Sequence, residues 1–188
     1  MINDTLLTGE LVRLVALDPE RDSALRVKWF ANSELTRLLD MGAFPRSSAK
    51  ASREWMEKHI NDWLEYEFSI ETLAEKRVIG FVGLVGNGVR SPHRDSFVGI
   101  GIGEPEFWGK GYGTDAMKLI LRYAFLELDL HRVSLDVFEY NPRAVRSYEK
   151  AGFKHEGRKR SALLREGRRW DEIFMGVLRE DWLGDNQP

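Results

Sequence analysis

The sequence has 188 residues, of which 43% are hydrophobic, 31% charged and 11% aromatic. This profile is typical of a soluble globular protein, and we expect residues 1–188 to form a single domain. The formal net charge of -2 excludes the overall basic field that draws a protein onto nucleic acid or anionic lipid. The absence of cysteine excludes disulfides, thiolate metal ligands and a cysteine nucleophile, so catalysis has to use oxygen and nitrogen groups.

No targeting or membrane signal is apparent. Residues 1–5 lack the basic start and long apolar run of a secretion signal, and no apolar stretch approaches the roughly 20 residues of a membrane span. We therefore expect a cytoplasmic protein. No metal site is expected either, because the histidines show no ligand spacing: His59, His93, His131 and His155.

The first half of the chain predicts a strand, two helices and three further strands. Residues 10–17 are a β-rich run, and Asp18-Pro19 marks the start of a helix to about Asn32. A second helical stretch begins at Ser47, and its spacing of three and four residues predicts a stripe that faces the core: Trp55, Met56, His59, Ile60, Trp63 and Leu64. An antiparallel meander follows, with strands at 67–73, 78–85 and 97–104.

The second half of the chain predicts helices alternating with strands. Its elements in chain order are a glycine-rich turn at 109–113, an amphipathic helix to about Glu127, a strand at 132–138, a helix at 142–151, and closing strands near 153–164 and 170–178. No internal repeat or linker separates these elements. We therefore expect one α/β domain.

The strand expected at 97–104 has one nearly bare face. Branched apolar residues on one face alternate with mostly glycine on the other: Val98, Ile100 and Ile102 against Phe97, Gly99, Gly101 and Gly103. Glycine inside a strand lowers stability, so this pattern predicts a bulge, a close backbone approach or a bound ligand. The alternative is a strand packed tightly against a helix.

Trp108-Gly109-Lys110-Gly111-Tyr112-Gly113-Thr114 is a glycine-rich turn that opens a helix. Glycines let successive N–H groups point at one position, and the helix start adds unpaired donors and the positive end of its dipole. This arrangement predicts an anion site that suits a pyrophosphate, with a plain loop as the alternative. Neither the P-loop pattern nor the dinucleotide glycine pattern fits the spacing.

Residues 141–153, NPRAVRSYEKAGF, predict a short capped helix. Asn141 as N-cap, Pro142 in the first turn and Gly152 at the end all have structural reasons to be there. Tyr148 lies two turns after the cap. Its phenol either packs in the core or points its hydroxyl into a cleft.

Together these segments resemble the GNAT superfamily of N-acetyltransferases, specifically its RimJ/RimL-type branch of ribosomal-protein-alanine acetyltransferases. Five segments carry the resemblance over almost the whole chain: LVRLVALDP at 11–19, IGFVGLVG at 79–86, WGKGYGTDA at 108–116, NPRAVRSYEKAGF at 141–153 and WDEIFMGVLREDW at 170–182. The resemblance implies a GNAT-like α/β (α+β) domain. Its sheet would be mixed and mostly antiparallel, with about seven strands splayed at the centre and helices on both faces.

The same resemblance implies how acetyl-CoA binds. The family pattern Q/R-x-x-G-x-G/A falls on residues 108–113, with Trp108 in place of the polar first residue, and puts the pyrophosphate on backbone N–H groups from Lys110 to Thr114. The pantetheine arm would pair with the backbone of Ile100 to Ile102 as an added strand. The implied coenzyme-binding residues are Ile100, Gly101, Ile102, Trp108, Gly109, Lys110, Gly111, Tyr112, Gly113, Thr114, Asn141, Ala144 and Tyr148.

Direct attack of a neutral amine on the thioester, without an acyl-enzyme, is the implied chemistry. Tyr148 matches the family's general acid, and an N–H near Ile102 is the candidate oxyanion donor. Deprotonating a peptide α-amine of pKa near 7.7 to 8.0 at pH 7 costs about 1 to 1.4 kcal/mol, against about 4.6 kcal/mol for an alkyl amine near 10.4. Glu104 and Glu106 are candidate bases, with solvated loop carboxylates as the alternative, and Asp136 lies on the neighbouring strand.

For the acceptor we expect a protein or peptide N-terminal α-amine, because the branch suggests it and the stretch from Leu35 to Ser47 offers only Asp40 as an acid. The alternatives are a small-molecule amine (a polyamine, an amino acid or an aminoglycoside) and a non-catalytic acyl-CoA-binding module. Residues 35–47 and the last hairpin should build the acceptor side. Acidic residues interspersed in that hairpin disfavour nucleic-acid binding. We expect a monomer or homodimer.

Overall fold

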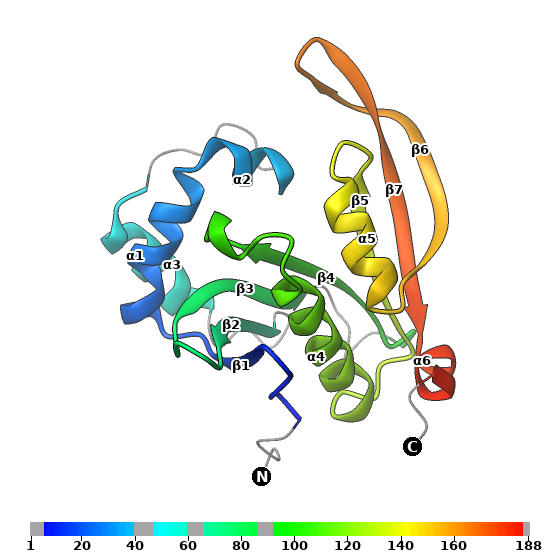
Figure 1. Ribbon diagram of the computed structural model, residues 1–188, viewed down its shortest axis with the longest axis horizontal. Helices are drawn as coiled ribbons and strands as arrows, with labels where there is room; N and C mark the ends of the chain where they lie inside the picture. The colour runs from blue at the N-terminus through cyan, green and yellow to red at the C-terminus, as the bar shows by residue number, and fades with distance from the viewer. Residues whose placement is uncertain (1–5, 40–46, 60–65, 86–91, 186–188) are drawn as a thin grey trace.

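The computed structural model describes residues 6–39, 47–59, 66–85 and 92–185. Its seven strands form one sheet with helices on both faces (Figure 1). The strands are β1 (Val12–Ala16), β2 (Tyr66–Thr72), β3 (Val78–Val85), β4 (Asp95–Ile102), β5 (Arg132–Phe138), β6 (Lys154–Arg165) and β7 (Arg168–Leu178). The helices are α1 (Pro19–Phe30), α2 (Ser33–Leu38), α3 (Ala49–His59), α4 (Tyr112–Leu126), α5 (Pro142–Lys150) and α6 (Arg179–Asp185), with a 3-10 turn, η1 (Pro105–Phe107).

The predicted strands and long helices are confirmed, whereas α2, η1 and α6 are not predicted by the sequence pattern. These three elements have six, three and seven residues, too few for a hydrophobic period to stand out. The core-facing stripe expected on α3 is confirmed for Met56, which is fully buried, but wrong for Trp55, which is 49% exposed. Ile60, Trp63 and Leu64 lie outside the described residues.

The strand order is β1-β2-β3-β4-β5-β7-β6, and every neighbouring pair is antiparallel except β4 and β5. The parallel pairing of β4 with β5 runs only from Asp95↔Arg132 to Phe97↔Ser134. Beyond that point β4 continues to Ile102 and β5 to Phe138 without pairing with each other. The expected splay is therefore present at the centre of the sheet, and we refer to this unpaired region between the two strands as the splay.

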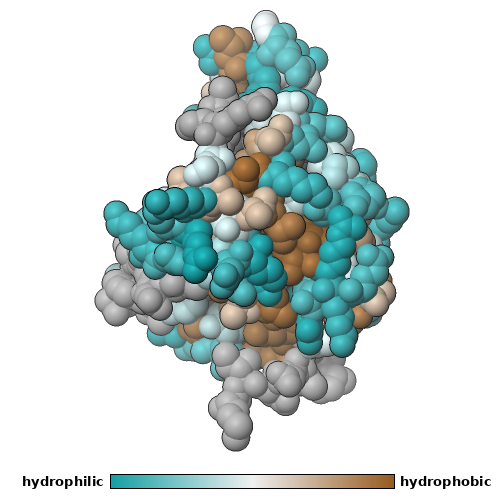
Figure 2. Space-filling model, turned by 90° about the vertical axis from the view of Figure 1, so that its left-hand side faces the viewer, coloured by the Kyte–Doolittle hydropathy of each residue, from teal (hydrophilic) through white to brown (hydrophobic). Residues whose placement is uncertain are grey.

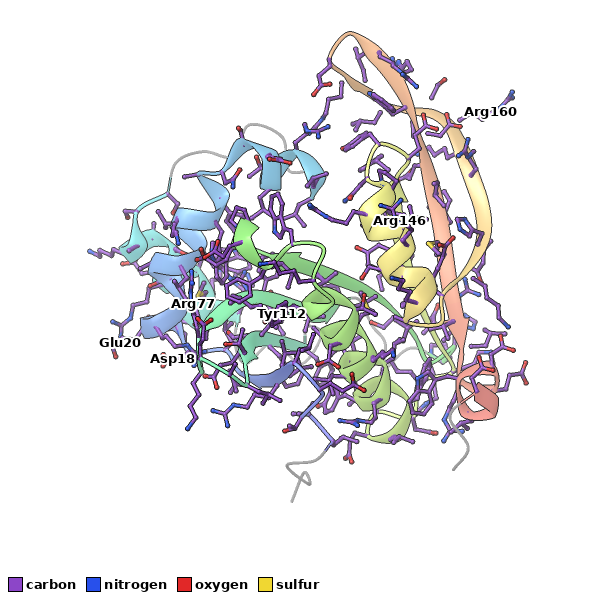
Figure 3. The ribbon with its side chains drawn as sticks, viewed as in Figure 1. Asp18, Glu20, Arg77, Tyr112, Arg146 and Arg160 are labelled. Carbon is purple, nitrogen blue, oxygen red and sulfur yellow. The ribbon has the colours of Figure 1, made fainter. Side chains whose placement is uncertain are left out.

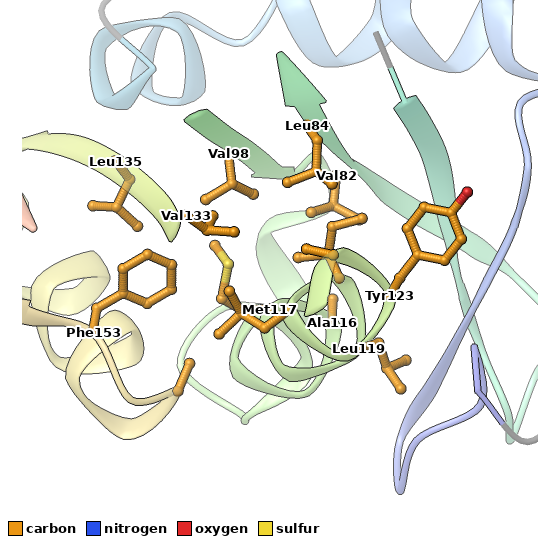
Figure 4. Packing of buried hydrophobic residues seen from close by; sticks show 14 of the residues in the cluster. Val82, Leu84, Val98, Ala116, Met117, Leu119, Tyr123, Val133, Leu135 and Phe153 are labelled. Carbon is orange, nitrogen blue, oxygen red and sulfur yellow. The ribbon is translucent and has the colours of Figure 1, made fainter. Parts of the chain in front are cut away.

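Helix α4 covers one face of the sheet because its apolar stripe packs on the inward side chains of the strands (Figure 4). Residues of this core include Val82, Leu84, Val98, Ala116, Met117, Leu119, Tyr123, Val133, Leu135 and Phe153. Helix α1 covers the other face, where Trp29 stacks on Phe81 of β3 with ring centroids 6.3 Å apart. On the α1 and α3 side of the molecule, hydrophilic residues surround a hydrophobic band (Figure 2).

The two aromatic rings under α1 explain two of the glycines in β4 and its extension. A Cβ on Gly101 would lie 2.7 Å from the Phe81 ring, and a Cβ on Gly103 would overlap Trp29. At Gly99, by contrast, a Cβ would meet nothing within 4 Å. At Gly101 and Gly103 the bare face is thus packed tightly against Phe81 of β3 and Trp29 of α1, which is the alternative that the sequence left open.

Candidate functional site

A cavity of about 440 Å³ lies beside the splay. Its lining comes from β4, the glycine turn, α4, α5, α2 and the segment before β1: Glu10, Leu11, Leu35, Leu38, Leu39, Ile100, Gly101, Ile102, Phe107, Trp108, Gly109, Gly111, Gly113, Thr114, Asp115, Lys118, Asn141, Arg143, Ala144, Arg146, Ser147, Tyr148 and Lys150. Every residue expected to bind coenzyme lies here except Lys110 and Tyr112. Lys110 is exposed, and the Tyr112 ring packs edge-on against Phe107 with centroids 5.0 Å apart.

The edge of β4 that faces the splay presents backbone donors and acceptors. The Gly103 N–H donates to the Ile79 carbonyl at 2.8 Å, which fixes the alternation of the antiparallel β3–β4 ladder. Residues 99, 101 and 103 therefore bond to β3, whereas the N–H and C=O groups of Ile100 and Ile102 point toward β5. Because β5 has diverged by then, an extended ligand can pair with the Ile100 groups and the Ile102 N–H as an added strand, whereas the Ile102 carbonyl already accepts from Trp108 Nε1 at 2.7 Å.

The start of α4 presents backbone N–H groups that no side chain caps. Gly109 and Gly111 have φ values of 71° and 94°, a left-handed conformation that glycine adopts without strain. Gly111 is the N-cap and has no side chain to cap the helix, so the first N–H groups of α4 lack an intrahelical partner. The neighbouring Asp115 carboxylate is already held by the N–H groups of Leu11 and Val12, at 2.8 and 3.0 Å.

Helix α5 forms the opposite wall of the cavity. Asn141 is confirmed as its N-cap, since the side chain accepts from the Ala144 N–H at 3.2 Å. Ser147 and Thr114 share a hydrogen bond of 2.8 Å between their hydroxyls, which ties α5 to the first turn of α4. The glycine turn and α5 are therefore held as one unit.

The Tyr148 phenol lines the cavity and makes no hydrogen bond within the described part of the chain. Its ring lies 6.1 Å from the Phe153 ring. Burial, assisted by the nearby charge of Asp136, raises the pKa of Tyr148 to about 12. The hydroxyl consequently stays protonated at neutral pH and acts as a donor.

Glu104, the expected base, is placed elsewhere. Its buried carboxylate accepts from Lys28 Nζ at 2.7 Å and Trp29 Nε1 at 2.9 Å, and forms an ion pair with Arg77 at 3.0 Å. Burial would raise the pKa of Glu104, but the hydrogen bonds from Lys28 and Trp29 lower it overall. With its oxygens occupied and no part in the cavity lining, Glu104 anchors the end of β4 to α1. Glu106 is exposed and pairs with Arg77 at 2.9 Å.

Sequence reasoning missed a set of basic residues around the cavity: Lys118, Arg143, Arg146 and Lys150. None of the four forms an ion pair within the described residues, although the chain as a whole carries a net charge of -2. Three of them lie at positions i, i+3 and i+7 of the helix at 142–150, so helical spacing could have shown that they share a face. We call these four side chains the basic rim. Figure 3 shows Arg146 on α5 and Tyr112 at the start of α4.

On the expected acceptor side, α2 is fastened to the β6–β7 hairpin and the end of β5. The Arg37 carbonyl accepts from the Tyr140 hydroxyl at 2.8 Å and from Arg165 Nη1 at 3.0 Å. The Tyr140 ring in turn packs edge-on against Trp170, with centroids 5.4 Å apart. Residues 40–46, which include Asp40, lie outside the described residues.

In the hairpin itself, the carboxylates interspersed among the basic residues are paired. Arg158 lies 3.1 Å from Asp171, and Lys159 lies 3.7 Å from Glu172.

Among the described residues no three or more histidine or acidic side chains form a group suited to a metal ion. No helix within those residues has both the length and the apolar character needed to cross a membrane.

The family model described as an acetyltransferase (GNAT) domain matches residues 12–154. The chain belongs to the GNAT acetyltransferase family. This acetyltransferase is 34% identical over 143 residues to a spermidine N(1)-acetyltransferase of Vibrio cholerae, over 76% of this chain and 80% of the relative. It is also 29% identical over 178 residues to YokL, a prophage-derived N-acetyltransferase of Bacillus subtilis, over 95% of this chain and 96% of the relative.

Among solved structures, the spermidine N-acetyltransferase from Vibrio cholerae in complex with CoA and spermine superimposes with a TM-score of 0.81 at 30% identity, over 92% of this chain and 98% of that one. These findings establish an acetyl-CoA-dependent N-acetyltransferase. The GNAT prediction is confirmed, whereas these relatives point to spermidine acetyltransferases rather than to the RimJ/RimL-type branch.

Proposed function

We propose that acetyl-CoA binds in the splay, with its pyrophosphate at the start of α4 and its acyl end between β4 and Tyr148. The observation that carries this placement is the cavity, which joins unpaired β4 backbone to an uncapped helix N-terminus. The basic rim fits the same ligand, because its cations form no ion pair within the described residues and CoA carries several phosphate charges.

Bound acetyl-CoA supplies an activated acetyl group as a thioester. The Ile102 N–H, which points into the splay, is placed to donate to the oxygen where negative charge develops. The amine nitrogen bonds to the acetyl carbon, the C–S bond breaks, and the proton that the nitrogen loses passes to solvent. Tyr148 donates a hydrogen bond to the departing sulfur. Proton transfer from a phenol of pKa about 12 to a thiolate of pKa near 8.5 has a free-energy cost of about 5 kcal/mol. We therefore assign Tyr148 the stabilisation of that sulfur by a hydrogen bond rather than its complete protonation.

For the acceptor we propose a polyamine such as spermidine. The similarity to spermidine acetyltransferases, by sequence and across 92% of the chain by structure, supports this class. On the α2 side of the cavity, Glu34 and Glu166 are the carboxylates that we propose to meet a distal ammonium group. Burial lowers the pKa of Arg143 and the charge of Glu34 opposes that shift, while Glu166 lies 3.8 Å from Arg37.

A peptide α-amine is the second candidate, and the lining of the cavity favours it. Leu35 and Leu38 of α2 and its C-cap Leu39 make this part of the lining apolar, and Arg143 of α5, which lies over the Trp108 ring, adds a positive charge. Polycations are held best where carboxylates compensate each ammonium group.

The expectation of a monomer or homodimer stays a prediction.

The test is acetyl transfer to spermidine, spermine and short peptides with free N-termini, followed through the release of free thiol at low salt. We expect efficient transfer to spermidine and a several-fold fall in kcat/KM for spermidine in Glu34→Gln. Glu75→Gln, in the exposed turn between β2 and β3, is the matched control. Transfer to peptides with spermidine inert would replace the polyamine by the second candidate.

A further inference from the structure

Trp108 connects the two sides of the splay. Its indole Nε1–H donates to the Ile102 carbonyl of β4 at 2.7 Å. The Arg143 guanidinium of α5 lies over the same ring, 4.3 Å from its centroid. The family pattern carries a polar residue at this position and implies only a place in the pyrophosphate turn, so these contacts point to a different role.

The first contact completes a clamp on one peptide group. The Ile102 carbonyl and the Gly103 N–H belong to the same planar peptide. Trp108 holds its carbonyl, and the Ile79 carbonyl holds its N–H at 2.8 Å. In a continuous sheet the next strand would bond to the Ile102 carbonyl, but β5 stops pairing with β4 after Phe97. Trp108 thus replaces the missing strand at the point where the acyl group is to lie.

We propose that Trp108 is a positioning residue for acetyl transfer: by clamping the Ile102–Gly103 peptide it keeps β4 extended, so that the Ile102 N–H is aimed at the thioester oxygen. This inference rests on the proposed placement of acetyl-CoA in the splay. Small displacements of an oxyanion donor slow acyl transfer strongly, because the donor acts on charge that exists only in the transition state. The Arg143 contact links this clamp to the basic rim.

The indole also packs in the aromatic cluster of Trp29 and Phe81, so two variants are needed to separate the donor from the ring. Trp108→Phe keeps a ring under Arg143 and removes the donor. Trp108→Gln removes the ring and keeps an N–H that can reach the carbonyl. Trp182→Phe, whose ring packs on Phe125 at the other end of the core, is the matched control.

We expect Trp108→Phe to lower kcat tenfold or more while the Kd for CoA stays within threefold, and Trp108→Gln to retain more of kcat than Trp108→Phe. Trp182→Phe should leave kcat unchanged. A Trp108→Phe enzyme with more than half of the original kcat would overturn the inference. So would losses of kcat that run in parallel with losses of CoA affinity and thermal stability, since these would mark a purely structural residue.

Two readouts are independent of turnover. Amide hydrogen exchange by NMR in the ligand-free protein should accelerate at Gly103 in Trp108→Phe, and the preference for acetyl-CoA over CoA in calorimetry should shrink. Unchanged exchange at Gly103 would remove the clamp and with it the inference. If the unmodified protein bound no CoA, the proposed placement of the coenzyme would fail instead, while exchange at Gly103 would still report on the clamp.

Discussion

Glu104 is the residue whose predicted and observed roles differ most. It is buried, and its carboxylate is shared by Lys28, Trp29 and Arg77. Glu104→Gln removes the carboxylate that pairs with Lys28 and one of the two that pair with Arg77, and we expect a loss of about 1–3 kcal/mol in the free energy of unfolding. Urea denaturation at pH 7 measures this loss. A change below 0.5 kcal/mol, roughly the scatter of neutral surface substitutions, would contradict the anchoring role.

The sign of the pH dependence at Glu104 follows from its lowered pKa. The charged form is favoured in the folded state, so the stabilisation is complete above the ordinary glutamate range and is lost as the pH falls through the folded pKa. The stability difference between the native protein and Glu104→Gln should therefore shrink between pH 6 and pH 3. A difference that stays constant over this range would show that the carboxylate charge does not contribute.

Tyr148 gives the second prediction at this scale. Tyr148→Phe removes the hydrogen bond to the departing sulfur but keeps the ring beside Phe153, so kcat should fall by about a hundredfold or more with little change in CoA affinity. Because the pKa of Tyr148 is raised to about 12, the hydroxyl stays protonated and the rate should not decline between pH 8 and pH 10. Steady-state kinetics with chemistry shown to be rate-limiting tests both points, and retention of half the turnover would return Tyr148 to a packing role.

At the scale of elements, the start of α4 contains two glycines with different reasons to be glycine. Gly111 has φ 94°, where any side chain is strained. Gly113 does not have a positive φ of this kind. A Cβ added at Gly113 would face the splay and lie 3.6 Å from Ile102 Cγ1, which is an ordinary van der Waals contact. We expect Gly113→Val to weaken CoA binding tenfold or more with little loss of stability, and Gly111→Val to lower both.

Calorimetry and thermal unfolding of the two variants separate these effects. Equal stability losses in both variants would show that Gly113 is also a structural glycine. Unchanged CoA affinity in Gly113→Val would remove the basis for placing the pyrophosphate at this helix start.

The elements also show where sequence reasoning works and where it ends. The turn at 109–113 and the capped helix at 142–150 are local features, and glycine, proline and asparagine identify them directly. The tight packing at Gly101 depends on Phe81, and that at Gly103 on Trp29, which is 74 positions away in the chain. Contacts of this kind follow from the tertiary fold, so the sequence left their meaning open, and the same holds for the partners of Glu104.

At the scale of the whole molecule, charge is distributed unevenly. Most described cations on the sheet are paired, whereas the basic rim is not. We expect the double variant Arg146→Gln, Lys150→Gln to weaken CoA binding several-fold at low salt, and the difference to fade at high salt because both side chains are exposed and screened. Arg160→Gln, exposed on β6 far from the cavity, is the matched control (Figure 3).

The comparison needs calorimetric titrations with CoA at 50 and 500 mM salt. Equal affinities of the double variant and the native protein at both salt concentrations would show that the rim does not bind phosphate. A similar loss in Arg160→Gln would point to the overall charge of the protein rather than to its position.

The short pairing of β4 with β5 has a mechanical consequence. Strands β1 to β4 and strands β5 to β7 are two half-sheets joined by a seam three residue pairs long. A bound coenzyme would link the two halves, because its arm would pair with β4 while its phosphates contact α4 and α5. The substrate would thus complete the sheet that the chain leaves open. At a coenzyme concentration of a hundred times Kd, binding stabilises the folded state by about 2.7 kcal/mol. We expect this stabilisation to make the two half-sheets unfold more cooperatively across the seam.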